Sequence, residues 1–236
     1  MNDLSQSERS RRVQTMFTRI AGRYDLMNRV MTGGRDIAWR REAVRHLNLP
    51  ADGRLLDLAT GTADLAFAVR ERYPRVQIEA MDFSHGILLG GVVKAKQRAE
   101  ANMFFGVGDA LALPFPNATF DGITNGFLLR NVVDLPRCLR ELRRVTKPGG
   151  AVVCLEITHP QTPVFKQVFQ LYFYKMVPVI GGLIAGDPQA YSYLPNSLTR
   201  FPPAKPLRDL FVAAGYREPY FKLLGLGTMA IHVGLA

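Results

Sequence analysis

The sequence predicts an α/β fold with a doubly wound, mostly parallel sheet of seven strands, and three observations lead to it. Short apolar runs alternate with helical patterns from residue 54 to residue 157, as in strand–helix–strand units. An aspartate stands at or near the end of each of the first three runs. The last two runs, 216–224 and 228–233, are joined by Gly225-Leu226-Gly227, which predicts a hairpin and an antiparallel C-terminal strand.

The parallel part of the sheet is expected to hold five strands, each a short apolar run: 55–58, 76–81, 104–107, 120–125 and 151–157. Helical patterns separate or follow these runs at 63–73, 86–101, 135–146 and 206–214. The segment Lys147-Pro148-Gly149-Gly150 has the composition of a turn before the fifth strand.

Two helices are expected before the sheet, forming a helical cap. Ser5 and Glu8 match a capping box that starts the first helix, and apolar residues recur at helical spacing from 13 to 20. We expect the segment 24–28 to close this helix, and Gly33-Gly34 to break the chain before a second helix that ends near residue 50.

The alternation stops after Pro160, where an insertion rich in Phe and Tyr begins. Phe165, Phe169 and Phe173 have the helical spacing of a core-facing stripe, whereas the Pro/Gly-interrupted apolar run at 176–186 is less easily explained as core. We expect one domain over 1–236: a helical cap (1–50), a ligand-binding core (51–160), a lid insertion (161–203) and a C-terminal helix with its hairpin (204–236).

Composition restricts the class of protein further. With 236 residues, 47% hydrophobic and 10% aromatic, the chain has enough apolar area for one core, which excludes disorder as its main state. Two cysteines and the lack of an apolar leader favour a reducing, cytoplasmic location, and the His and Cys residues show no metal-ligand spacing. The net charge of +10 leaves nucleic acid, an anionic membrane or an anionic ligand open, although solvated helix faces also explain it.

The segment 55–64 carries the strongest local signal for a ligand site. Its turn has one glycine, Gly61, where a nicotinamide-binding loop would show three. Asp57 on the preceding strand would repel a pyrophosphate but would pair with a cationic amine. S-adenosylmethionine carries an ammonium and a sulfonium, so it suits this turn better than NAD, although a plain turn with a solvated Asp is the alternative.

Two further aspartates support this interpretation. Asp82 ends the second expected strand, where a carboxylate can accept both hydroxyls of a ribose. Asp109 and Ala110 follow the third strand, where a carboxylate and a backbone amide can hold an adenine edge. Each aspartate alone could be a helix N-cap, but three at successive strand ends predict a nucleoside site.

These motifs, together with others, resemble the ubiquinone/menaquinone biosynthesis C-methyltransferases over nearly the whole chain. The resemblance is carried by segments spread along the chain. They are Phe17 to Asn28, Asp57 to Asp64, Met81-Asp82-Phe83-Ser84, Gly108-Asp109-Ala110 with Leu113-Pro114-Phe115, Thr119-Phe120-Asp121, Leu129-Arg130-Asn131-Val132, the 147–150 turn, Tyr191-x-Tyr193-Leu194 and His232-x-Gly234. The resemblance implies a Rossmann-like methyltransferase sheet. It also implies S-adenosyl-L-methionine as the methyl donor, and as acceptor a polyprenylated benzoquinol or naphthoquinol, in bacteria usually demethylmenaquinol.

The resemblance also assigns site residues. Those expected at the cofactor are Asp57, Gly61, Thr62, Asp82, Phe83, Asp109, Ala110 and Gly126, and those expected in catalysis are Arg130, Asn131, Tyr24 and Asp25. The chain departs from the family pattern at three positions: Ala63 and Leu128 stand where Gly is common, and Gly126 where Ser is common.

The chemistry can be considered from the residues themselves. Methylation of a ring carbon requires the quinol to lose a phenolic proton, whose ordinary pKa is about 10. Arg130 could stabilise the developing oxyanion, and Asn131 could orient a hydroxyl or a water. Tyr24 and Asp25 could position the ring or relay the proton, and His232 could act as a base. An ion pair for Arg130, a helix cap for Asn131 and a core position for His232 are the alternatives.

Partners and rival functions remain open at this point. We expect the 176–186 run to form a lid or to meet an anionic membrane where the prenyl tail emerges, so that the enzyme is cytoplasmic or peripheral at the inner face of the membrane. A homodimer is open, and no nucleic acid is expected. The rivals are a methyltransferase acting on another small molecule or on RNA, and a non-catalytic member of the fold.

Overall fold

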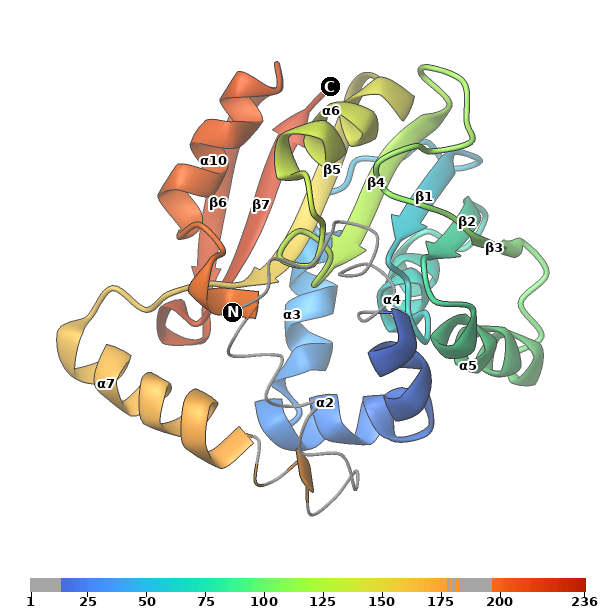
Figure 1. Ribbon diagram of the computed structural model, residues 1–236. Coiled ribbons are helices and arrows are strands. Elements are labelled where there is room, and N and C mark those ends of the chain that lie inside the picture. Colours follow the sequence, from blue (N-terminus) through green and yellow to red (C-terminus); the bar gives the residue numbers. More distant parts are fainter. Residues whose placement is uncertain (1–13, 178, 180, 183–196) are drawn as a thin grey trace.

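The computed structural model describes residues 14–177, 179, 181–182 and 197–236 (Figure 1). Its sheet has seven strands in the order β3-β2-β1-β4-β5-β7-β6. The strands are β1 (Arg54–Leu58), β2 (Gln77–Asp82), β3 (Met103–Val107), β4 (Phe120–Gly126), β5 (Thr146–Ile157), β6 (Arg217–Leu224) and β7 (Met229–Leu235). Strands β1 to β5 pair in parallel, whereas β7 runs antiparallel to both β5 and β6. The predicted fold class is confirmed.

Helices cover both faces of the sheet because neighbouring strand residues point to opposite sides. On β1, Leu55 packs in one core with residues of α3 (Arg35–Val44), α4 (Asp64–Arg72) and α5 (His85–Gln97). Leu56 packs in the other core with residues of α6 (Leu135–Val145) and α10 (Ala204–Ala213). Both leucines are fully buried, which is typical of the central strand of a parallel sheet.

The N-terminal helices and the insertion close the end of the sheet where the parallel strands finish. In Figure 1 the arrowheads of β1 and β4 point toward the end at which α2 (Tyr24–Thr32) and α7 (Pro163–Leu171) lie. A π-helical segment, η2 (Tyr172–Met176), extends α7, and the Tyr172 hydroxyl donates a 2.8 Å hydrogen bond to the carbonyl of Met31. Met27 of α2 and Phe173 of η2 are buried in the same core. The strand order reverses between β1 and β4, where α/β sheets commonly bind ligands.

Several element boundaries differ from the sequence-based expectation, and α3 ends at Val44 rather than near residue 50. The segment 24–28 does not close the first helix: the 3₁₀ turn η1 (Ala21–Arg23) interrupts it, and α2 begins at Tyr24. The 147–150 segment is part of β5 rather than a separate turn. Phe120 pairs with Thr146 and Gly122 with Ala151, so these residues bulge out of register against β4.

Other expectations are confirmed, or lie outside the described residues. Gly33 ends α2 with φ of +58° and Gly34 precedes α3 with φ of +78°, as the predicted break requires. The capping-box residues Ser5 and Glu8, the tyrosine motif at 191–193 and most of the 176–186 run lie outside the described residues. Among those described, no helix is long and apolar enough to span a bilayer.

Candidate active site

A first cavity lies at the carboxyl ends of the parallel strands. It is lined by the segments that follow β1, β2, β3 and β4 and by the N-terminal residues. Six of the eight residues expected at the cofactor line it: Gly61, Asp82, Phe83, Asp109, Ala110 and Gly126. The strand-end pattern in the sequence thus converges on one place in the fold.

Asp82 organises this cavity. Its Oδ2 accepts a 2.9 Å hydrogen bond from the backbone N–H of Gly61, and its Oδ1 accepts a 2.8 Å bond from that of Ser84. The end of β2 therefore holds the loop that follows β1. Burial raises the pKa of Asp82, while hydrogen bonds from these backbone N–H groups oppose the rise.

The polar groups of the first cavity fit an adenosine that carries no phosphate. Its described lining includes two carboxylates, Asp82 and Asp109, and no Lys or Arg side chain. Carboxylates accept hydrogen bonds from ribose hydroxyls and from an exocyclic amine, whereas they repel a pyrophosphate. Phe83, Ile87 and Leu111 add apolar surface for a base. The residues present therefore fit an adenosyl group attached to a cation.

Asp57 and Thr62 lie behind this cavity rather than on its wall. Both oxygens of the buried Asp57 carboxylate accept hydrogen bonds from hydroxyls, one from Thr60 at 2.6 Å and one from Thr124 at 2.7 Å. Burial raises the pKa of Asp57 to about 6. The Thr62 hydroxyl donates a 2.5 Å hydrogen bond to Asp25. Asp57 thus braces the loop after β1 from within the sheet.

A second, larger cavity of about 480 Å³ lies between the N-terminal helices and the insertion, beside the first cavity of about 110 Å³. Its wall consists mostly of Met, Phe, Leu, Ile and Val side chains from residues 16–39, 165–177 and 225–229. Its described lining contains no Asp, Glu or His. Such a cavity suits a large apolar ligand.

Arg130 is a buried cation on the wall of the second cavity. Its Nη1 lies 2.7 Å from Oε2 of Glu156, and the two side chains are 4% and 1% exposed. The guanidinium also stacks 4.9 Å above the ring centroid of Phe127. Its Nε is buried without a hydrogen-bond acceptor. Arg130 therefore has both the predicted structural ion pair and one N–H that is free to donate.

The two cavities meet at Phe17, Tyr24 and Phe127, which line both. Burial raises the pKa of Tyr24, opposed by the neighbouring Asn28, Arg40 and Arg130, so its phenol is a donor at neutral pH. Phe127 has φ of +62°, a left-handed backbone that costs energy in a bulky residue and is often found at functional sites. Asn131 lines the first cavity and donates a 2.7 Å hydrogen bond to the carbonyl of Phe127.

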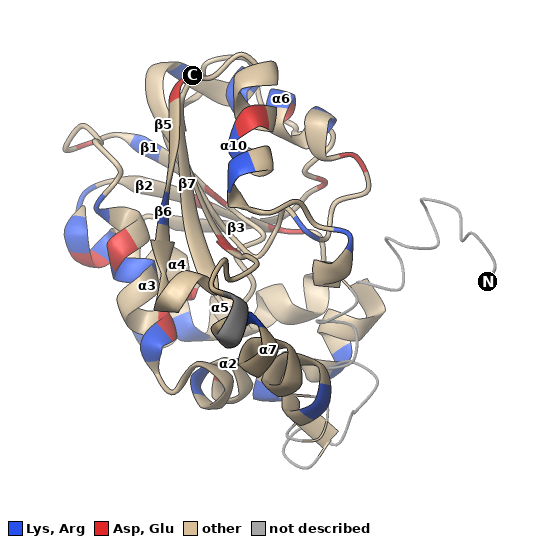
Figure 2. Cartoon of the chain, turned by 90° about the vertical axis from the view of Figure 1, so that its left-hand side faces the viewer, with Lys and Arg blue, Asp and Glu red and all other residues tan. Residues whose placement is uncertain are grey.

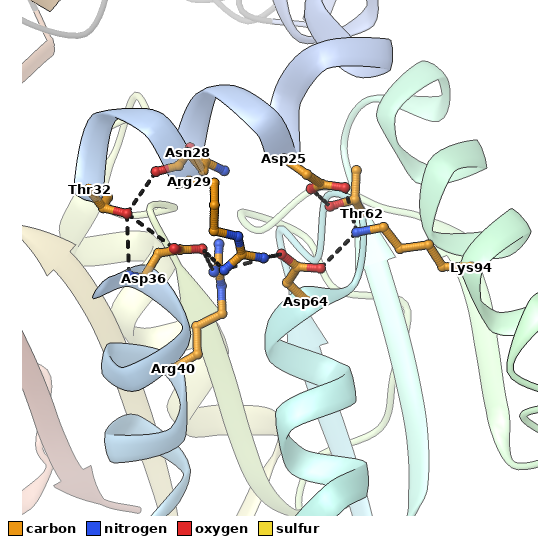
Figure 3. A network of polar contacts seen from close by, with 9 residues as sticks. All are labelled: Asp25, Asn28, Arg29, Thr32, Asp36, Arg40, Thr62, Asp64 and Lys94. Atoms are coloured by element: carbon orange, nitrogen blue, oxygen red, sulfur yellow. Dashed lines mark hydrogen bonds and ion pairs between the residues drawn. The ribbon is translucent and has the colours of Figure 1, made fainter. Parts of the chain in front are cut away.

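Asp25 lies in a polar network beneath these cavities (Figure 3). Its carboxylate is 2.6 Å from Nζ of Lys94 and accepts the hydrogen bond from Thr62. Asp25 is not among the described residues that line either cavity. This arrangement ties α2, which carries Tyr24, to α5 and to the loop after β1.

His232 lies in the sheet, away from both cavities. It is 1% exposed on β7, and its Nε2 is 2.9 Å from the carbonyl of Ala204. Burial lowers its pKa to about 4, so it is neutral at pH 7. His232 therefore has the core position that was the alternative to a catalytic base. Among the described residues, no group of three His, Cys, Asp or Glu is placed to hold a metal ion.

Three residues at the site were not assigned from sequence. Glu156 carries the counter-charge of Arg130, and Phe127 lines both cavities. The Nδ2 of Asn28, on the second cavity, is buried without a hydrogen-bond acceptor. Asn28 and Phe127 had a signal, since each belongs to a segment compared with the family. A glutamate inside an apolar strand has no distinctive spacing, and nothing in the sequence indicates the left-handed backbone of Phe127.

Comparison with known proteins places the chain. A model of the ubiE/COQ5 methyltransferase family matches residues 5–236. The chain belongs to the ubiE/COQ5 methyltransferase family. It is 45% identical over 224 residues to the ubiquinone/menaquinone biosynthesis C-methyltransferase UbiE of Desulfotalea psychrophila, covering 94% of this chain and 89% of that protein. It is 44% identical over 219 residues to the demethylmenaquinone methyltransferase of Thermus thermophilus, covering 93% and 99%.

Solved structures of low sequence identity share the fold. A SAM-dependent methyltransferase from Aquifex aeolicus aligns with a TM-score of 0.60 at 14% identity, covering 84% of this chain and 89% of that one. The cyclase SpnF aligns with a TM-score of 0.72 at 18% identity, covering 96% of each chain. Because this chain belongs to the ubiE/COQ5 family, it is a methyltransferase. The family implies S-adenosyl-L-methionine as the cofactor, as expected from the sequence.

Proposed function

We propose that this ubiE/COQ5 family methyltransferase transfers a methyl group from S-adenosyl-L-methionine to a ring carbon of a polyprenylated quinol, specifically demethylmenaquinol. One observation carries the proposal. A cavity whose carboxylates fit an adenosyl cation adjoins a larger apolar cavity that contains a buried arginine, and the two meet at Tyr24 and Phe127. Relatives named demethylmenaquinone methyltransferase support the choice of ring.

The first cavity would hold the methyl donor. Asp82 would accept hydrogen bonds from the ribose, and Asp109 with the backbone of Ala110 would face the adenine edge. Phe83 would cover the base, and Gly61 and Gly126 would let the donor approach bare backbone. When bound, the sulfonium supplies an electrophilic methyl group. The remaining catalytic work falls to the residues of the second cavity.

Arg130 and Asn28 would bind the oxygen of the ring in the second cavity. Arg130 Nε and Asn28 Nδ2 are buried donors without acceptors on a mostly apolar wall, and such groups need a partner. A phenolate oxygen would provide it, and a charged donor would stabilise the phenolate more than the neutral phenol. Because the described wall has no carboxylate or His, the phenolic proton would leave to water.

Tyr24 would position the ring at the junction, and Asn131 would hold Phe127 in its left-handed conformation. Asp25 would act through Tyr24 rather than on the ring, because its carboxylate is already engaged by Lys94 and Thr62. These roles give each of the four residues expected in catalysis a place, with Arg130 nearest to the chemistry.

The test is transfer of labelled methyl from S-adenosylmethionine to demethylmenaquinol, a demethylated benzoquinol and total RNA, assayed in parallel. We expect label in the menaquinol fraction. Label only in the benzoquinol would mean that the acceptor ring is a benzoquinol and not a naphthoquinol. Label only in RNA would contradict the proposal. Figure 2 shows Lys and Arg spread over several helices with Asp and Glu between them, which does not favour an RNA-binding patch.

We also infer that the insertion meets an anionic lipid surface where the prenyl tail leaves the second cavity. Val168, Leu171 and Met176 line that cavity and are 56%, 62% and 50% exposed, with Lys166 and Lys175 nearby in sequence. Cations near an anionic bilayer contribute about 1 kcal/mol each. Flotation with phosphatidylglycerol vesicles should carry the protein. A triple change of these apolar residues to Ser should abolish flotation, and failure of the unaltered protein to float contradicts the inference.

Two further expectations concern the methyl acceptor and the oligomeric state. Methyl transfer to a different small phenol remains the alternative, and label in such a phenol, but in neither quinol, would favour it. A homodimer stays a prediction from the sequence, which light scattering on the purified protein tests directly.

A further inference from the structure

The hairpin between β6 and β7 turns through three consecutive residues with positive φ, η3 (Gly225–Gly227). The φ angles are +56° at Gly225, +57° at Leu226 and +83° at Gly227. Glycine adopts such angles without steric cost, whereas in a leucine the Cβ crowds the following carbonyl oxygen. The turn would form more easily with Gly or Asn at position 226, so the turn itself does not account for the leucine.

Packing does not account for this leucine either. Leu226 is 75% exposed, the highest value among the large apolar side chains of the described residues. It belongs to neither of the two hydrophobic cores. A single exposed leucine is ordinary on a protein surface, but here the backbone is strained as well, and strained residues of this kind gather at functional sites.

The turn holds Leu226 at the wall of the second cavity. Gly225, Leu226 and Thr228 all line that cavity. The Thr228 hydroxyl donates a 2.8 Å hydrogen bond to the carbonyl of Gly225, which closes the turn. A Cβ at position 225 would lie 3.1 Å from Cζ2 of Trp39, so the turn packs closely on this ring of the same wall. These contacts fix the place at which the leucine is presented.

Leu226 adds to an apolar rim that the insertion begins. Val168, Leu171 and Met176 also line the second cavity and are at least half exposed. In Figure 1 the turn between β6 and β7 lies at the same end of the sheet as α7. The apolar wall of the cavity therefore continues to the surface at both the insertion and the hairpin. Exposed apolar residues that are continuous with a cavity mark a path for an apolar ligand.

We propose that Leu226 is a specificity-determining residue, which packs against the prenyl tail of the acceptor where the tail leaves the second cavity. The inference rests on the proposed function, because it requires the quinol ring beside Arg130. A bound tail removes the exposed leucine from water, which favours acceptors with a tail over the bare ring. Gly or Asn at this position would relieve the backbone strain but would lose this contact.

The test compares two acceptors, 1,4-naphthoquinol without a tail and the same ring with a tail of two isoprene units. Both are assayed without vesicles or detergent, so that no bilayer is present. Leu226→Asn accepts the positive φ but is polar, and Leu226→Met keeps an apolar side chain. The matched control is Glu218→Asn in β6, an exposed residue with φ of +49° that is not among the described residues lining either cavity.

The chain supplies its own probe of acceptor binding. Trp39 is the one tryptophan in the sequence, and it lines the second cavity. Quenching of its fluorescence by the oxidised quinones therefore measures their affinity without any methyl transfer.

For Leu226→Asn we expect kcat/KM with the tailed quinol to fall roughly 5- to 30-fold through a higher KM, as the loss of an apolar contact implies. Affinity for the tailed quinone should fall by the same factor, whereas both values for the bare ring should change less than about threefold. Leu226→Met should stay near wild type. Leu226→Asn and Glu218→Asn should each raise the midpoint of thermal unfolding by about 2–5 °C, because each relieves backbone strain. Glu218→Asn should leave tail selectivity unchanged.

Equal losses for the two acceptors in Leu226→Asn, or no loss for either, would overturn this proposal alone. A wild-type chain that binds the two quinones equally well would do the same. Unchanged tail selectivity in Leu226→Asn, together with lost flotation on phosphatidylglycerol vesicles, would assign the leucine to the bilayer and not to the tail. A wild-type chain that methylates neither acceptor and shows no quenching by either quinone would overturn the proposed function as well.

Discussion

Glu156 holds Arg130 in an ion pair of 2.7 Å beneath the second cavity, with both side chains almost completely buried. The pair explains how a cation is retained in a mostly apolar wall: Glu156 neutralises one side of the guanidinium, while Nε stays without an acceptor. Burial raises the pKa of Glu156, and Arg130 opposes the rise. The pair thus supplies a fixed donor whose cost of burial is already offset within the fold.

Replacing Arg130 by Lys should reduce catalysis far more than binding. Lys keeps the charge but lacks the planar fork that reaches Glu156 and a ring oxygen together. We expect kcat to fall roughly 100- to 1000-fold, the usual effect of losing one oxyanion donor. Affinity for S-adenosylhomocysteine should be unchanged within about threefold. Steady-state kinetics and calorimetry check this, and an unaltered kcat would remove Arg130 from the mechanism.

Breaking the ion pair from the other side should destabilise the protein. In Glu156→Gln the Arg130 cation is left buried without its counter-charge, which costs about 3–5 kcal/mol in free energy of unfolding. The double variant Arg130→Met/Glu156→Leu removes both charges and should recover most of that loss while remaining inactive. Urea unfolding measures the three stabilities. A double variant less stable than Glu156→Gln would contradict the account.

Asp57 should make stability fall as pH rises from about 4 to 7. Its pKa in the folded state, about 6, lies above the ordinary 3.8, so in this range the folded protein binds more protons than the unfolded chain. Ionising Asp57 therefore costs stability, about 3 kcal/mol over the full range. Asp57→Asn lacks this titration, so its stability relative to wild type should rise by that amount. A difference that does not vary with pH would be inconsistent with a raised pKa.

The bulge in β5 should depend on Gly150. A Cβ there would lie 2.7 Å from the carbonyl oxygen of Asp121 and 3.0 Å from that of Lys147. Because backbone atoms cannot easily move aside, Gly150→Ala should cost about 1–3 kcal/mol. Gly126→Ala is the matched control, since its Cβ would meet only Leu65 at 3.7 Å. Thermal unfolding compares the two, and equal stabilities would mean that the bulge relaxes freely.

The sheet and the first cavity could be predicted because their signals are local. Apolar runs mark β1 to β5, and aspartates at successive strand ends meet at one rim whatever the details of packing. Asp82 and Asp109 line the first cavity, as that logic predicts. Asp57 is not among the described residues that line this cavity, because it lies within β1, where its buried carboxylate accepts hydrogen bonds from two threonines. Strand periodicity alone does not show these partners.

The second cavity could not be predicted as a space. It forms between residues 16–39, 165–177 and 225–229, which are far apart in the sequence, and its apolar side chains have the same spacing as core residues. Phe127 adopts a left-handed backbone with no sequence mark. The start of α2 at Tyr24 was also missed, because the helical periodicity continues across the 3₁₀ turn that separates the two helices.

The most direct test of the central claim is to locate the transferred methyl group. Demethylmenaquinol is incubated with the protein and S-adenosylmethionine carrying ¹³C in its methyl group, and the product is examined by ¹³C NMR and mass spectrometry. We expect one labelled methyl on a ring carbon next to a phenolic oxygen, with the yield greatly reduced in Arg130→Lys. Label on the oxygen as a methyl ether, or no label in the quinol at all, would contradict the account.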